Sequence, residues 1–366
     1  MSQGWLSKKL KDVCVMQRGF DLPKKDRRSG NFPLISSSGA IDFHAEAKVT
    51  GPGVVTGRSG SIGQVFFIEE DFWPLNTSLY IKEFHGNDPR FIYYLLKSFD
   101  LSRYTSGAGV PTLNRNHVHD EDVLIPLDIE EQKRIVAILD QAFSDIDKAR
   151  ALTEKNLKNA RELFESYLRK VFSQRGERWV DSTLANVAEN LDRKRIPITK
   201  KDRVEGEYPY YGASGIVDYV NHYIFDEELL LVSEDGANLL ARTYPVAFTA
   251  TGKYWVNNHA HVLRFKDSFI QKFIEYYLNS ISLRPYVSGM AQPKLNQKAL
   301  NSIPVPSVDS VIAKNVVGRL SALEDELNRV QKIYKAKLDR LDELKKSLFQ
   351  KAFAGELTKD SEESAA

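Results

Sequence analysis

The sequence predicts an α+β protein in which two similar mixed α/β domains are joined by two long helices that form an antiparallel coiled coil. Three observations support this fold class. The chain repeats itself after about 180 residues, the first part of each half contains short β-branched and aromatic runs, and the last part of each half is nearly free of proline and glycine. Because 366 residues exceed what one hydrophobic core usually serves, two domains are expected.

The repeat consists of matched residues that keep their order in both halves. Each half opens with a Trp-led segment, WLSKKLKDV from Trp5 and WVDSTLANV from Trp179. Further matches lie 182 residues apart: Trp73 with Trp255, Asn76 with Asn258, Ser106 with Ser288, Gly107 with Gly289, Pro111 with Pro293 and Asn114 with Asn296. A period this long indicates a tandem duplication and not a solenoid, so both domains should share one fold.

The mixed part of each half should contain strands followed by a helix. Runs of β-branched and aromatic residues at 53–56, 65–68, 229–232 and 261–265 indicate strands. Asp88-Pro89 is a good N-cap and first-turn pair for a helix through Lys97, and a matching helix is expected from Asp267 to Ser280. The expected mixed domains span residues 1–128 and 176–307.

The end of each half should be one long helix, over residues 129–175 and 308–357. Apolar residues recur there at spacings of three and four, which is typical of a coiled-coil seam. The seam residues are Ile135, Leu139, Ala142, Ile146, Ala149, Ala160, Leu163, Tyr167 and Val171, and then Leu320, Leu323, Leu327, Val330, Tyr334, Leu338, Leu341, Leu344 and Leu348. Since domain, helix, domain and helix alternate along the chain, the second helix must run back along the first. The pair is then antiparallel and pseudo-two-fold symmetric, and residues 358–366 are expected to be a disordered tail.

Composition narrows the class of protein. The hydrophobic share of 42% argues against disorder, and no apolar run approaches the roughly 20 residues that span a bilayer. The first residues lack the apolar stretch of a secretory signal. Cys14 is the single cysteine, which excludes an intrachain disulfide. Together these features predict a cytoplasmic protein.

Charge is balanced within each half but locally clustered. Residues 1–128 carry 15 basic and 15 acidic side chains, and residues 179–307 carry 14 of each. The clustered basic residues are Lys24, Lys25, Arg27 and Arg28 in the first half, and Arg193, Lys194, Arg195, Lys200 and Lys201 in the second. A solvated loop is the plain explanation for one such cluster. Because neither half is strongly basic, charge alone does not predict nucleic-acid binding, but two clusters at similar places in both halves weaken the solvated-loop explanation.

Catalytic and metal-binding motifs are incomplete in this sequence. Gly252-Lys253 lacks the upstream glycine and the following Ser or Thr of a phosphate-binding loop. GRSGSIG at 57–63 lacks a dinucleotide-binding opening and indicates a tight loop with close backbone approach. His259 and His261 have no second Cys/His cluster, so no metal site is expected. Cys14 is expected to be a small core residue.

Two similar domains held apart by a rigid helical spacer are suited to bind a polymer at two separate places. Each helix would be about 65 Å long at 1.5 Å per residue, and equivalent groove faces of B-DNA recur about every 34–36 Å. Because the two domains differ outside their shared framework, the two half-sites should differ too. The expected target is therefore a split, asymmetric DNA sequence.

The DNA-contact candidates are side chains able to pair with base edges or hold phosphates. In the first domain they are Lys24, Lys25, Arg27, Arg28, Arg58, Ser59, Ser61, Thr105, Ser106, Asn114 and Arg115. In the second they are Arg193, Lys194, Arg195, Tyr211, Ser214, Asn238, Lys253, Ser288, Gln292, Lys294, Asn296 and Gln297. Residues shared by both halves, such as Asn114 and Asn296, fit a framework or phosphate role better than base reading. Differing neighbours, such as Arg115 and Gln297, are the better readout candidates.

From Trp5 to about Leu357 the chain resembles a type I restriction-modification specificity subunit. The segments that carry the resemblance are YPYYGASGIVDYVNHYIF (208–225), EDGANLL (234–240), TATGKYWVNNHAHVL (249–263), the SG…P.LN stretches within 104–114 and 286–296, and KSLFQKAFAGEL (346–357). The resemblance implies a non-catalytic subunit that binds double-stranded DNA, two methyltransferase subunits and restriction subunits. S-adenosylmethionine, and ATP with Mg, would then belong to those partner subunits.

Apolar residues off the helical seam suggest a second buried face where a partner docks, namely Ile138, Phe143, Leu152 and Phe164. Two alternatives to a specificity subunit remain open at this point. A self-contained methyltransferase or nuclease would require a catalytic motif. A coiled-coil adaptor for proteins would carry no DNA specificity in residues 1–128 or 179–307.

Overall fold

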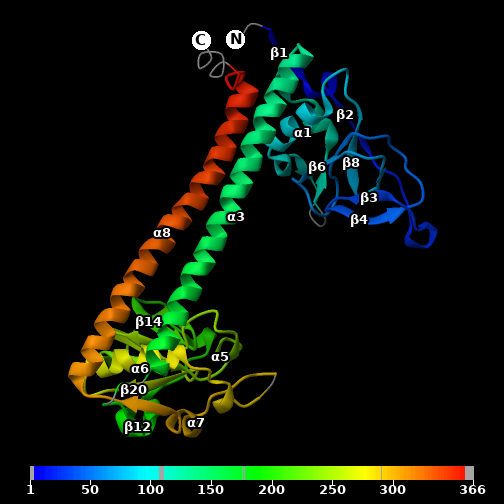
Figure 1. The fold of residues 1–366 in the computed structure, drawn as a ribbon. Coiled ribbons are helices and arrows are strands. Elements are labelled where there is room, and N and C mark those ends of the chain that lie inside the picture. Colours follow the sequence, from blue (N-terminus) through cyan, green and yellow to red (C-terminus); the bar gives the residue numbers. More distant parts are fainter. Residues whose placement is uncertain (1–3, 107–110, 175, 177, 290, 359–366) are drawn as a thin grey trace, which may run out of the picture. The chain divides into compact units, whose positions relative to one another are not determined.

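The computed structural model describes residues 4–106, 111–174, 176, 178–289 and 291–358, which form two compact units. Unit 1 contains residues 1–153 and 335–366, and unit 2 contains residues 154–334. The helices α3 (Ile129–Ser173) and α8 (Ser310–Ala354) contribute one end to each unit (Figure 1). Gly107 of the sequence repeat and residues 359–366 of the expected tail lie outside the described residues.

Unit 1 is built around a four-stranded sheet and a three-stranded sheet. Its strands are β1 (Trp5–Lys9), β2 (Val15–Arg18), β3 (Phe32–Ser36), β4 (Gly39–His44), β5 (Gly53–Gly57), β6 (Val65–Ile68), β7 (Trp73–Pro74), β8 (Ser78–Glu83), β9 (Thr105–Ser106), β10 (Thr112–Leu113) and β11 (Asp122–Pro126). The larger sheet has the order β2-β8-β5-β6, and the smaller has the order β4-β3-β7. The pairs β1-β11 and β9-β10 are separate two-stranded sheets.

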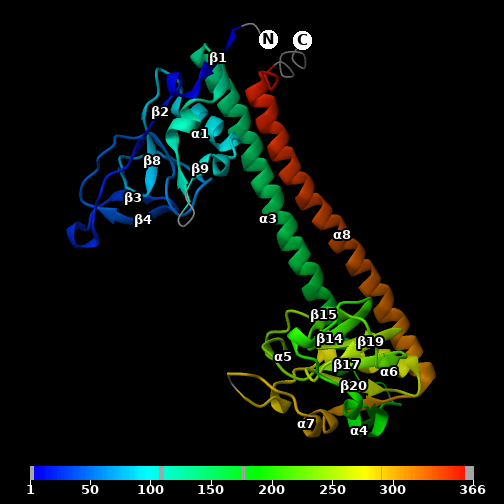
Figure 2. The ribbon, with the colours of Figure 1, turned by 180° about the vertical axis from the view of Figure 1, so that it is seen from behind.

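Unit 2 repeats this arrangement. Its strands are β12 (Val180–Thr183), β13 (Glu189–Asn190), β14 (Tyr208–Gly212), β15 (Gly215–Val220), β16 (Phe225–Asp226), β17 (Leu229–Ser233), β18 (Ala247–Ala250), β19 (Lys253–Val256), β20 (Ala260–Arg264) and β21 (Pro304–Ser307). The sheet orders are β13-β20-β17-β18 and β15-β14-β19-β16, with β12 paired to β21. Figure 2 labels β14, β15, β17, β19 and β20 of this unit. The larger sheets of the two units match strand for strand, as the sequence duplication predicts, and the second sheet of unit 2 has β16 as an additional strand.

The central strands form because their residues are apolar on both faces. Every residue of β5 (GVVTG) and of β17 (LLLVS) is buried, which is typical of a strand covered on both sides. Helix α1 (Pro89–Ser98) contacts β5 and β6 in unit 1, and α6 (Ser268–Ser280) contacts β17 and β18 in unit 2. The helices therefore cover the larger sheet of their own unit.

Both of these helices begin at the aspartate expected from the sequence. The Asp88 carboxylate accepts a hydrogen bond from the amide of Phe91, and Pro89 occupies the first turn. The Asp267 carboxylate accepts from the amides of Phe269 and Ile270. Such caps satisfy amides that have no partner inside the helix, so the two N-cap predictions are confirmed.

Within each unit, the ends of α3 and α8 run antiparallel. In unit 1 the Arg150 guanidinium pairs with Asp342, and Lys345 Nζ lies 3.4 Å from Asp147 Oδ1. In unit 2 the part of α3 before Tyr167 shares a groove with residues 323–330 of α8, and the part after it shares another with residues 312–319. In both units, the residue numbers on α8 decrease as those of their partners on α3 increase, which is the pattern of antiparallel helices.

The buried stripe of α3 departs from the expected seam after its middle. Leu163, an expected seam residue, is 73% exposed, whereas Leu168 and Phe172 are buried. On α8 the expected seam residues Leu323 and Leu344 are also exposed. A straight helix with 3.6 residues per turn drifts against a repeat of 3.5, so a strict heptad series leaves the buried face.

The segment after α8 belongs to the core of unit 1. Trp5, Ala352 and Leu357 are buried members of one cluster, which brings the end of α8 to the first strand. Thr358, assigned to the tail by the sequence, is buried and its hydroxyl bonds to Glu131. Within the described residues, no helix combines the length and apolar character needed to cross a bilayer.

Candidate nucleic-acid interface

In unit 1, two loops meet beside the end of β5. We call residues 57–64 and 104–115, apart from 107–110, the unit-1 loop cluster. The amide of Leu113 donates to the carbonyl of Arg58 at 2.8 Å, and Ser59 forms a β-bridge with Thr112. Strands β9 and β10 pair Ser106 with Thr112. These backbone contacts hold polar side chains from distant parts of the sequence in one place.

In unit 2, the matching loops meet beside the end of β17. We call residues 234–246 and 286–297 the unit-2 loop cluster. The amide of Leu295 donates to the carbonyl of Glu234 at 2.7 Å, the same bond that Leu113 makes in unit 1. The amide of Gly236 donates to the carbonyl of Pro293 at 3.0 Å, and Ser288 and Lys294 exchange backbone hydrogen bonds. The framework of the two clusters is therefore shared.

The two clusters differ in the length of their first loop. Gly53 aligns with Leu229 at the start of the strand before this loop, and Val65 aligns with Ala247 after it, so the unit-2 loop is six residues longer. It contains the short helix α5 (Asn238–Ala241). Because of this insertion, the offset between matched residues of the two halves is six residues larger after the loop than before it.

The short loop of unit 1 requires a glycine at its start. A Cβ on Gly57 would lie 1.8 Å from the carbonyl oxygen of Ser61, and Gly60 and Gly63 have φ angles of +91° and +97°. Backbone approaches this close exclude a side chain, and positive φ angles favour glycine. The tight loop predicted from GRSGSIG is confirmed.

Most of the first-domain candidates lie in the unit-1 loop cluster: Arg58, Ser59, Ser61, Thr105, Ser106, Asn114 and Arg115. Ser61, Thr105, Ser106 and Arg115 are exposed. The Arg58 guanidinium donates to the carbonyl of Asn76 at 3.2 Å, and that of Arg115 donates to the carbonyl of Met16 at 3.1 Å. The two arginines are thus held against the sheet at the cluster.

The unit-2 loop cluster holds the matching candidates: Asn238, Ser288, Gln292, Lys294, Asn296 and Gln297. Gln297 matches Arg115, and its side-chain amide donates to the Asn190 side chain at 2.8 Å. Both residues therefore reach the same edge strand of their sheet, β2 or β13. Asn238 is different, because its amide group bonds to the backbone of Tyr244 in both directions and closes its own loop.

Asn114 and Asn296 are N-caps. The Asn114 side chain accepts from the amide of Asn116, at the start of α2 (Arg115–His119), and Asn296 accepts from the amide of Ala299, at the start of α7 (Gln297–Asn301). These bonds occupy the side-chain oxygens that base pairing with adenine would use. The geometry agrees with the framework role expected for residues shared by both halves.

Of the second basic cluster predicted from the sequence, Lys200 and Lys201 align with the first cluster, whereas residues 193–195 do not. The 3₁₀ helix η2 (Lys24–Asp26) matches η5 (Lys200–Asp202), and Arg27 matches Arg203. Arg27 pairs with Asp42 at 3.7 Å and Arg203 pairs with Asp218 at 2.9 Å, each on the neighbouring hairpin. The nearby Arg28 pairs with Glu46. Lys24 and Lys25 remain exposed and available for phosphate contact.

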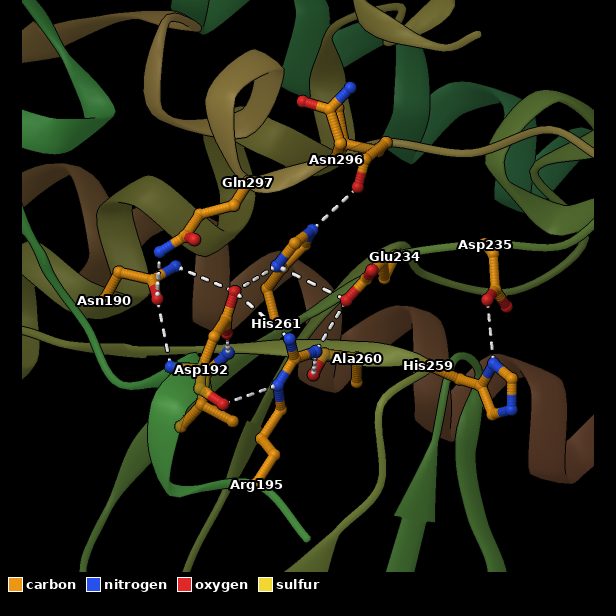
Figure 3. A network of polar contacts seen from close by, with 12 residues as sticks. Asn190, Asp192, Arg195, Glu234, Asp235, His259, Ala260, His261, Asn296 and Gln297 are labelled. Carbon is orange, nitrogen blue, oxygen red and sulfur yellow. Dashed lines mark hydrogen bonds and ion pairs between the residues drawn. The ribbon is translucent and has the colours of Figure 1, made fainter. Parts of the chain in front are cut away.

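Arg195 lies in a buried ionic network and not on a binding surface, which corrects the expectation for this residue. Its Nη1 lies 2.6 Å from Glu234 Oε2 and donates to the carbonyl of Ala260 at 2.8 Å, and its Nη2 lies 3.4 Å from Asp192 Oδ2 (Figure 3). The arginine side chain is 13% exposed. The neighbouring Arg193 and Lys194, in η4 (Asp192–Lys194), are exposed.

Asp192, Glu234 and His261 bring three possible metal ligands within 4.8 Å of one another. The Arg195 guanidinium occupies the position facing both carboxylates, and Lys294 Nζ approaches Glu234 Oε1 at 3.2 Å. Two cations, Arg195 and Lys294, are already paired with these two carboxylates, so the geometry is that of an ion-paired network. His259 lies apart and pairs with Asp235 at 2.7 Å (Figure 3).

The hairpin candidates of unit 2 have separate surroundings. Ser214 is exposed at the tip of the β14–β15 hairpin, next to Ala213, whose carbonyl accepts from the Ser233 hydroxyl. Tyr211 packs against Phe248, and burial raises the pKa of its hydroxyl. Lys253 lies over the ring of Tyr223 at 4.9 Å, so it contacts an aromatic ring of its own unit.

Cys14 and two of the partner-docking candidates are committed to the core of unit 1. Cys14 is fully buried, and burial raises the pKa of its thiol to about 12, which agrees with a core role. Phe143 is buried against Tyr94 and Phe349, so the expectation that it faces a partner is wrong. Ile138 packs on the same core. Of the four candidates, only Leu152 is mostly exposed, and Phe164 lines the groove of unit 2.

Asn190, Asp192 and Glu234 also hold the unit-2 loop cluster in place, and none of them was a predicted site residue. Asn190 and Asp192 lie in no quoted segment, and Glu234 was only the first residue of EDGANLL, with no role assigned to it. The sequence contains one indication of this buried polar group, a mismatch between the two repeats. His261 occupies the position at which the first half has Leu79. A polar residue in a strand that is apolar in its repeat indicates a buried partner.

Taken together, the fold defines a duplicated recognition protein, with two matching sheet-rich units that each present a polar loop cluster. A family model described as the type I restriction modification DNA specificity domain matches residues 2–158 and 176–338. The chain therefore belongs to the family of type I restriction-modification DNA specificity domains.

One named relative and two solved structures are similar to this chain. A Haemophilus influenzae protein named as a type I restriction enzyme specificity subunit, S.HindORF215P, is 37% identical over 147 residues, which cover 39% of this chain and 37% of the relative. A chain from work on complex assembly and conformational transition of the type I R-M system has a TM-score of 0.77 at 16% identity and covers 98% of this chain and 99% of its own. The HsdS subunit of Thermoanaerobacter tengcongensis has a TM-score of 0.57 at 17% identity, with 98% of both chains covered. The two structures show a shared fold.

Proposed function

We propose that this chain is the DNA sequence-specificity subunit of a type I restriction-modification complex. In this role unit 1 and unit 2 each read one half of a bipartite, asymmetric DNA site. The subunit is non-catalytic, and S-adenosylmethionine and ATP with Mg are bound by partner subunits. Because such a complex acts on DNA inside the cell, the proposal includes a cytoplasmic location.

One observation carries this proposal. Both halves match the DNA specificity domain, and their loop clusters share a backbone framework while the side chains on it differ. Arg115 in unit 1 and Gln297 in unit 2 occupy matched positions at the start of α2 and α7. Arginine pairs with guanine and glutamine with adenine, so unlike side chains on a common framework suit unlike half-sites.

The helices offer a place for a partner. In unit 2 an apolar groove of about 420 Å³ lies between α3 and α8 and is lined by Ala160, Leu163, Phe164, Tyr167, Leu323, Glu326, Leu327 and Val330. Leu163 and Leu323 are large apolar side chains that remain exposed there. Exposed apolar surface of this kind marks interaction sites. We assign the groove to a methyltransferase subunit, with a second methyltransferase subunit and the restriction subunits completing the complex.

The test is to map adenine methylation in cells that express the chain with the methyltransferase subunit of its own system. The expected result is one methylated bipartite motif. Replacing residues 1–128 by those of a relative should change one half of that motif, and replacing residues 176–307 should change the other. Motifs that stay the same after both exchanges would show that these domains do not determine specificity.

A matched pair of variants tests the groove separately. Leu163→Asp places a charge in the apolar groove and should abolish co-purification with the methyltransferase subunit. Glu162→Ala changes an exposed neighbour on α3 and should leave it intact. If both variants retain the partner while the motif exchange succeeds, the docking site lies elsewhere on the chain.

A further inference from the structure

The loop 234–246, which is six residues longer than its counterpart in unit 1, is anchored to the core of unit 2. Leu239 and Val246 are both buried members of that core. The amide of Val246 also donates to the side chain of Asn279 at 2.9 Å. A backbone hydrogen bond joins the loop to segment 286–297. The longer loop is therefore a built part of the unit-2 loop cluster.

Between these anchors, Arg242 holds a turn of the backbone. Its φ angle of +55° lies in the left-handed region, which a residue with a side chain adopts only where its surroundings hold it there. Its guanidinium donates to the carbonyls of Leu278 and Ile281, at the end of α6. Carbonyls at the end of a helix lack partners inside it, and a cation is favourable there. The turn is thus fixed to the helix that covers the larger sheet.

Tyr244 follows this turn, and its backbone is held on both sides. Its amide donates to Asn238 Oδ1 at 2.9 Å, and its carbonyl accepts from Asn238 Nδ2 at 3.1 Å. Pro245 comes next, and a residue before proline has a restricted backbone. Tyr244 is nevertheless 60% exposed. The loop therefore fixes the point from which an exposed aromatic ring projects.

The unit-1 loop cluster differs at this point. In its described part, the larger apolar side chains pack on the core of unit 1, namely Ile62, Tyr104 and Leu113. In the unit-2 loop cluster, Leu240 and Tyr244 are exposed. Tyr244 is the one whose backbone is clamped by a side chain of the same loop. The ring thus lies where the two units should read different bases.

A fixed aromatic ring in a loop that reads DNA can contact a base in two ways. Insertion between neighbouring bases requires that they unstack and that the duplex kinks. Contact with a base edge in the major groove requires neither, and the apolar group on such an edge is the C5-methyl of thymine. A ring that is already held in place also loses little freedom on binding. Edge contact with a thymine methyl is therefore favoured.

We propose that Tyr244 is a specificity-determining residue of unit 2, that it contacts the C5-methyl group of a thymine in the half-site of this unit, and that Asn238 is its positioning residue. This inference rests on the proposed function and names a chemical group within the half-site. It gives the longer loop of unit 2 a role that the shorter loop of unit 1 does not share.

The test uses the purified complex of the full-length chain with its methyltransferase subunit and duplexes that carry the mapped motif. Each thymine is replaced in turn by deoxyuridine, which removes the C5-methyl group and keeps the base-pairing groups. With the wild type, one replacement in the half-site of unit 2 should raise Kd about fourfold, as expected for one buried methyl group. If no replacement in this half-site changes Kd, the inference is wrong.

Variants assign the effect to one side chain. Tyr244→Ala should bind the thymine and deoxyuridine duplexes equally, whereas Tyr244→Phe keeps the ring and should preserve the difference. Asn238→Ala keeps the ring but releases its backbone, so the difference should become smaller. A full difference that persists in Tyr244→Ala would show that another group contacts the methyl, and would overturn the inference.

Two controls have similar exposed apolar side chains. Tyr219→Ala removes an exposed tyrosine of β15, outside the loop cluster, and Leu240→Ala removes the other exposed apolar side chain of the same loop. Both should retain the difference between thymine and deoxyuridine. Loss of the difference in Leu240→Ala together with its retention in Tyr244→Ala would assign the contact to the wrong residue and overturn the inference.

Photo-crosslinking gives a readout of the contact itself. At the sensitive position, 5-iododeoxyuridine carries iodine in place of the methyl group, and irradiation should crosslink the DNA to the peptide that contains Tyr244, as identified by mass spectrometry. A crosslink confined to another peptide would overturn the inference. A motif that does not respond to exchange of residues 176–307 would instead contradict the proposed function.

Discussion

Units 1 and 2 share their sheet order but differ in the polarity of the interior next to the loop clusters. In unit 1, Arg18 and Asp21 form an ion pair at 3.3 Å with side chains 50% and 67% exposed. In unit 2 the strand pairing places Asp192 and Arg195 at the matched positions, with the signs reversed and exposures of 6% and 13%. The two units therefore share their strands, whereas the charges beside the loops are opposite in sign and are buried in unit 2.

This difference shows where a duplicated domain can change its chemistry. The buried residues of the central strands β5 and β17 are mostly apolar, so a change there would cost packing. Residues at the ends of β2, β5 and β8 face the loop cluster, where a polar group can find partners. The unit-2 network meets the requirement that buried charges be paired and hydrogen-bonded. The loop clusters are therefore the variable part of an otherwise repeated framework.

The largest expected effect comes from removing the buried cation. Arg195→Met leaves Asp192 and Glu234 without their guanidinium partner and should destabilise unit 2 by about 3–5 kcal/mol, as breaking a buried ion pair does. Hydrogen exchange of the full-length chain, resolved by peptide, should show lost protection in β17 and β20. The exchange of β5 and β8 reports on unit 1 in the same experiment.

Arg18→Met is the matched control in unit 1. Because this pair is exposed, its loss should change stability by no more than about 1 kcal/mol. Equal losses of protection in the two variants would show that burial of the charges does not distinguish the units, and the comparison would fail.

A second contrast concerns the first residue of the loop after the central strand. Gly57→Ala brings a Cβ to within 1.8 Å of a backbone oxygen, so the loop must move, and a cost of about 1–3 kcal/mol is expected for this overpacking. The matched residue in unit 2 is Ser233, because the longer loop leaves room for a side chain. Chemical denaturation should show that Gly57→Ala destabilises unit 1, and methylation mapping should show weaker recognition at the half-site proposed for this unit.

Ser233→Ala provides the comparison. It removes one hydrogen bond, from the Ser233 hydroxyl to the carbonyl of Ala213, and should cost only about 1 kcal/mol. If Gly57→Ala is tolerated as well as Ser233→Ala, the short loop is not constrained by the close approach at Ser61.

The features that the sequence predicted are those set by local pattern. The alternation and length of apolar runs located β5, β6, β17 and β20, and Asp88 and Asp267 located two helix starts, because these signals act within a few residues. Long-range pairing was less accessible. The basic residues at 193–195 and 200–201 were both grouped with those at 24–28. Only strand register shows that 200–203 is the matching part, and only the three-dimensional structure shows that Arg195 is largely buried.

Side-chain availability was the least predictable property. Phe143 and Leu163 both lie on α3 with suitable apolar character, yet the first is buried and the second is 73% exposed. Which of the two side chains is buried depends on a shift of the buried stripe of α3 by one residue. The stripe drifts around the helix over many turns, and a heptad series alone does not predict that drift. For the loop clusters, the sequence identified the shared Asn and Pro residues but not the groups from other elements that support them.

The smallest effect should be equal in the two units and concerns the shared caps. Asn114→Ala and Asn296→Ala each remove a bond to a helix amide and should cost about 1 kcal/mol in their own unit. Because the caps are framework, neither variant should change the methylated motif, although each should lower the denaturation midpoint. The two variants must be compared in the full-length chain under identical conditions.

Asn114→Asp and Asn296→Asp distinguish a cap from a base contact. Aspartate caps a helix about as well as asparagine, so stability should return to that of the wild type. A carboxylate has no donor for adenine N7, so a residue that reads adenine would lose its function on this change. If Asn114→Asp changes one half of the methylated motif, Asn114 contacts a base. The two units would then share less of their framework than the matched backbone bonds of Leu113 and Leu295 indicate.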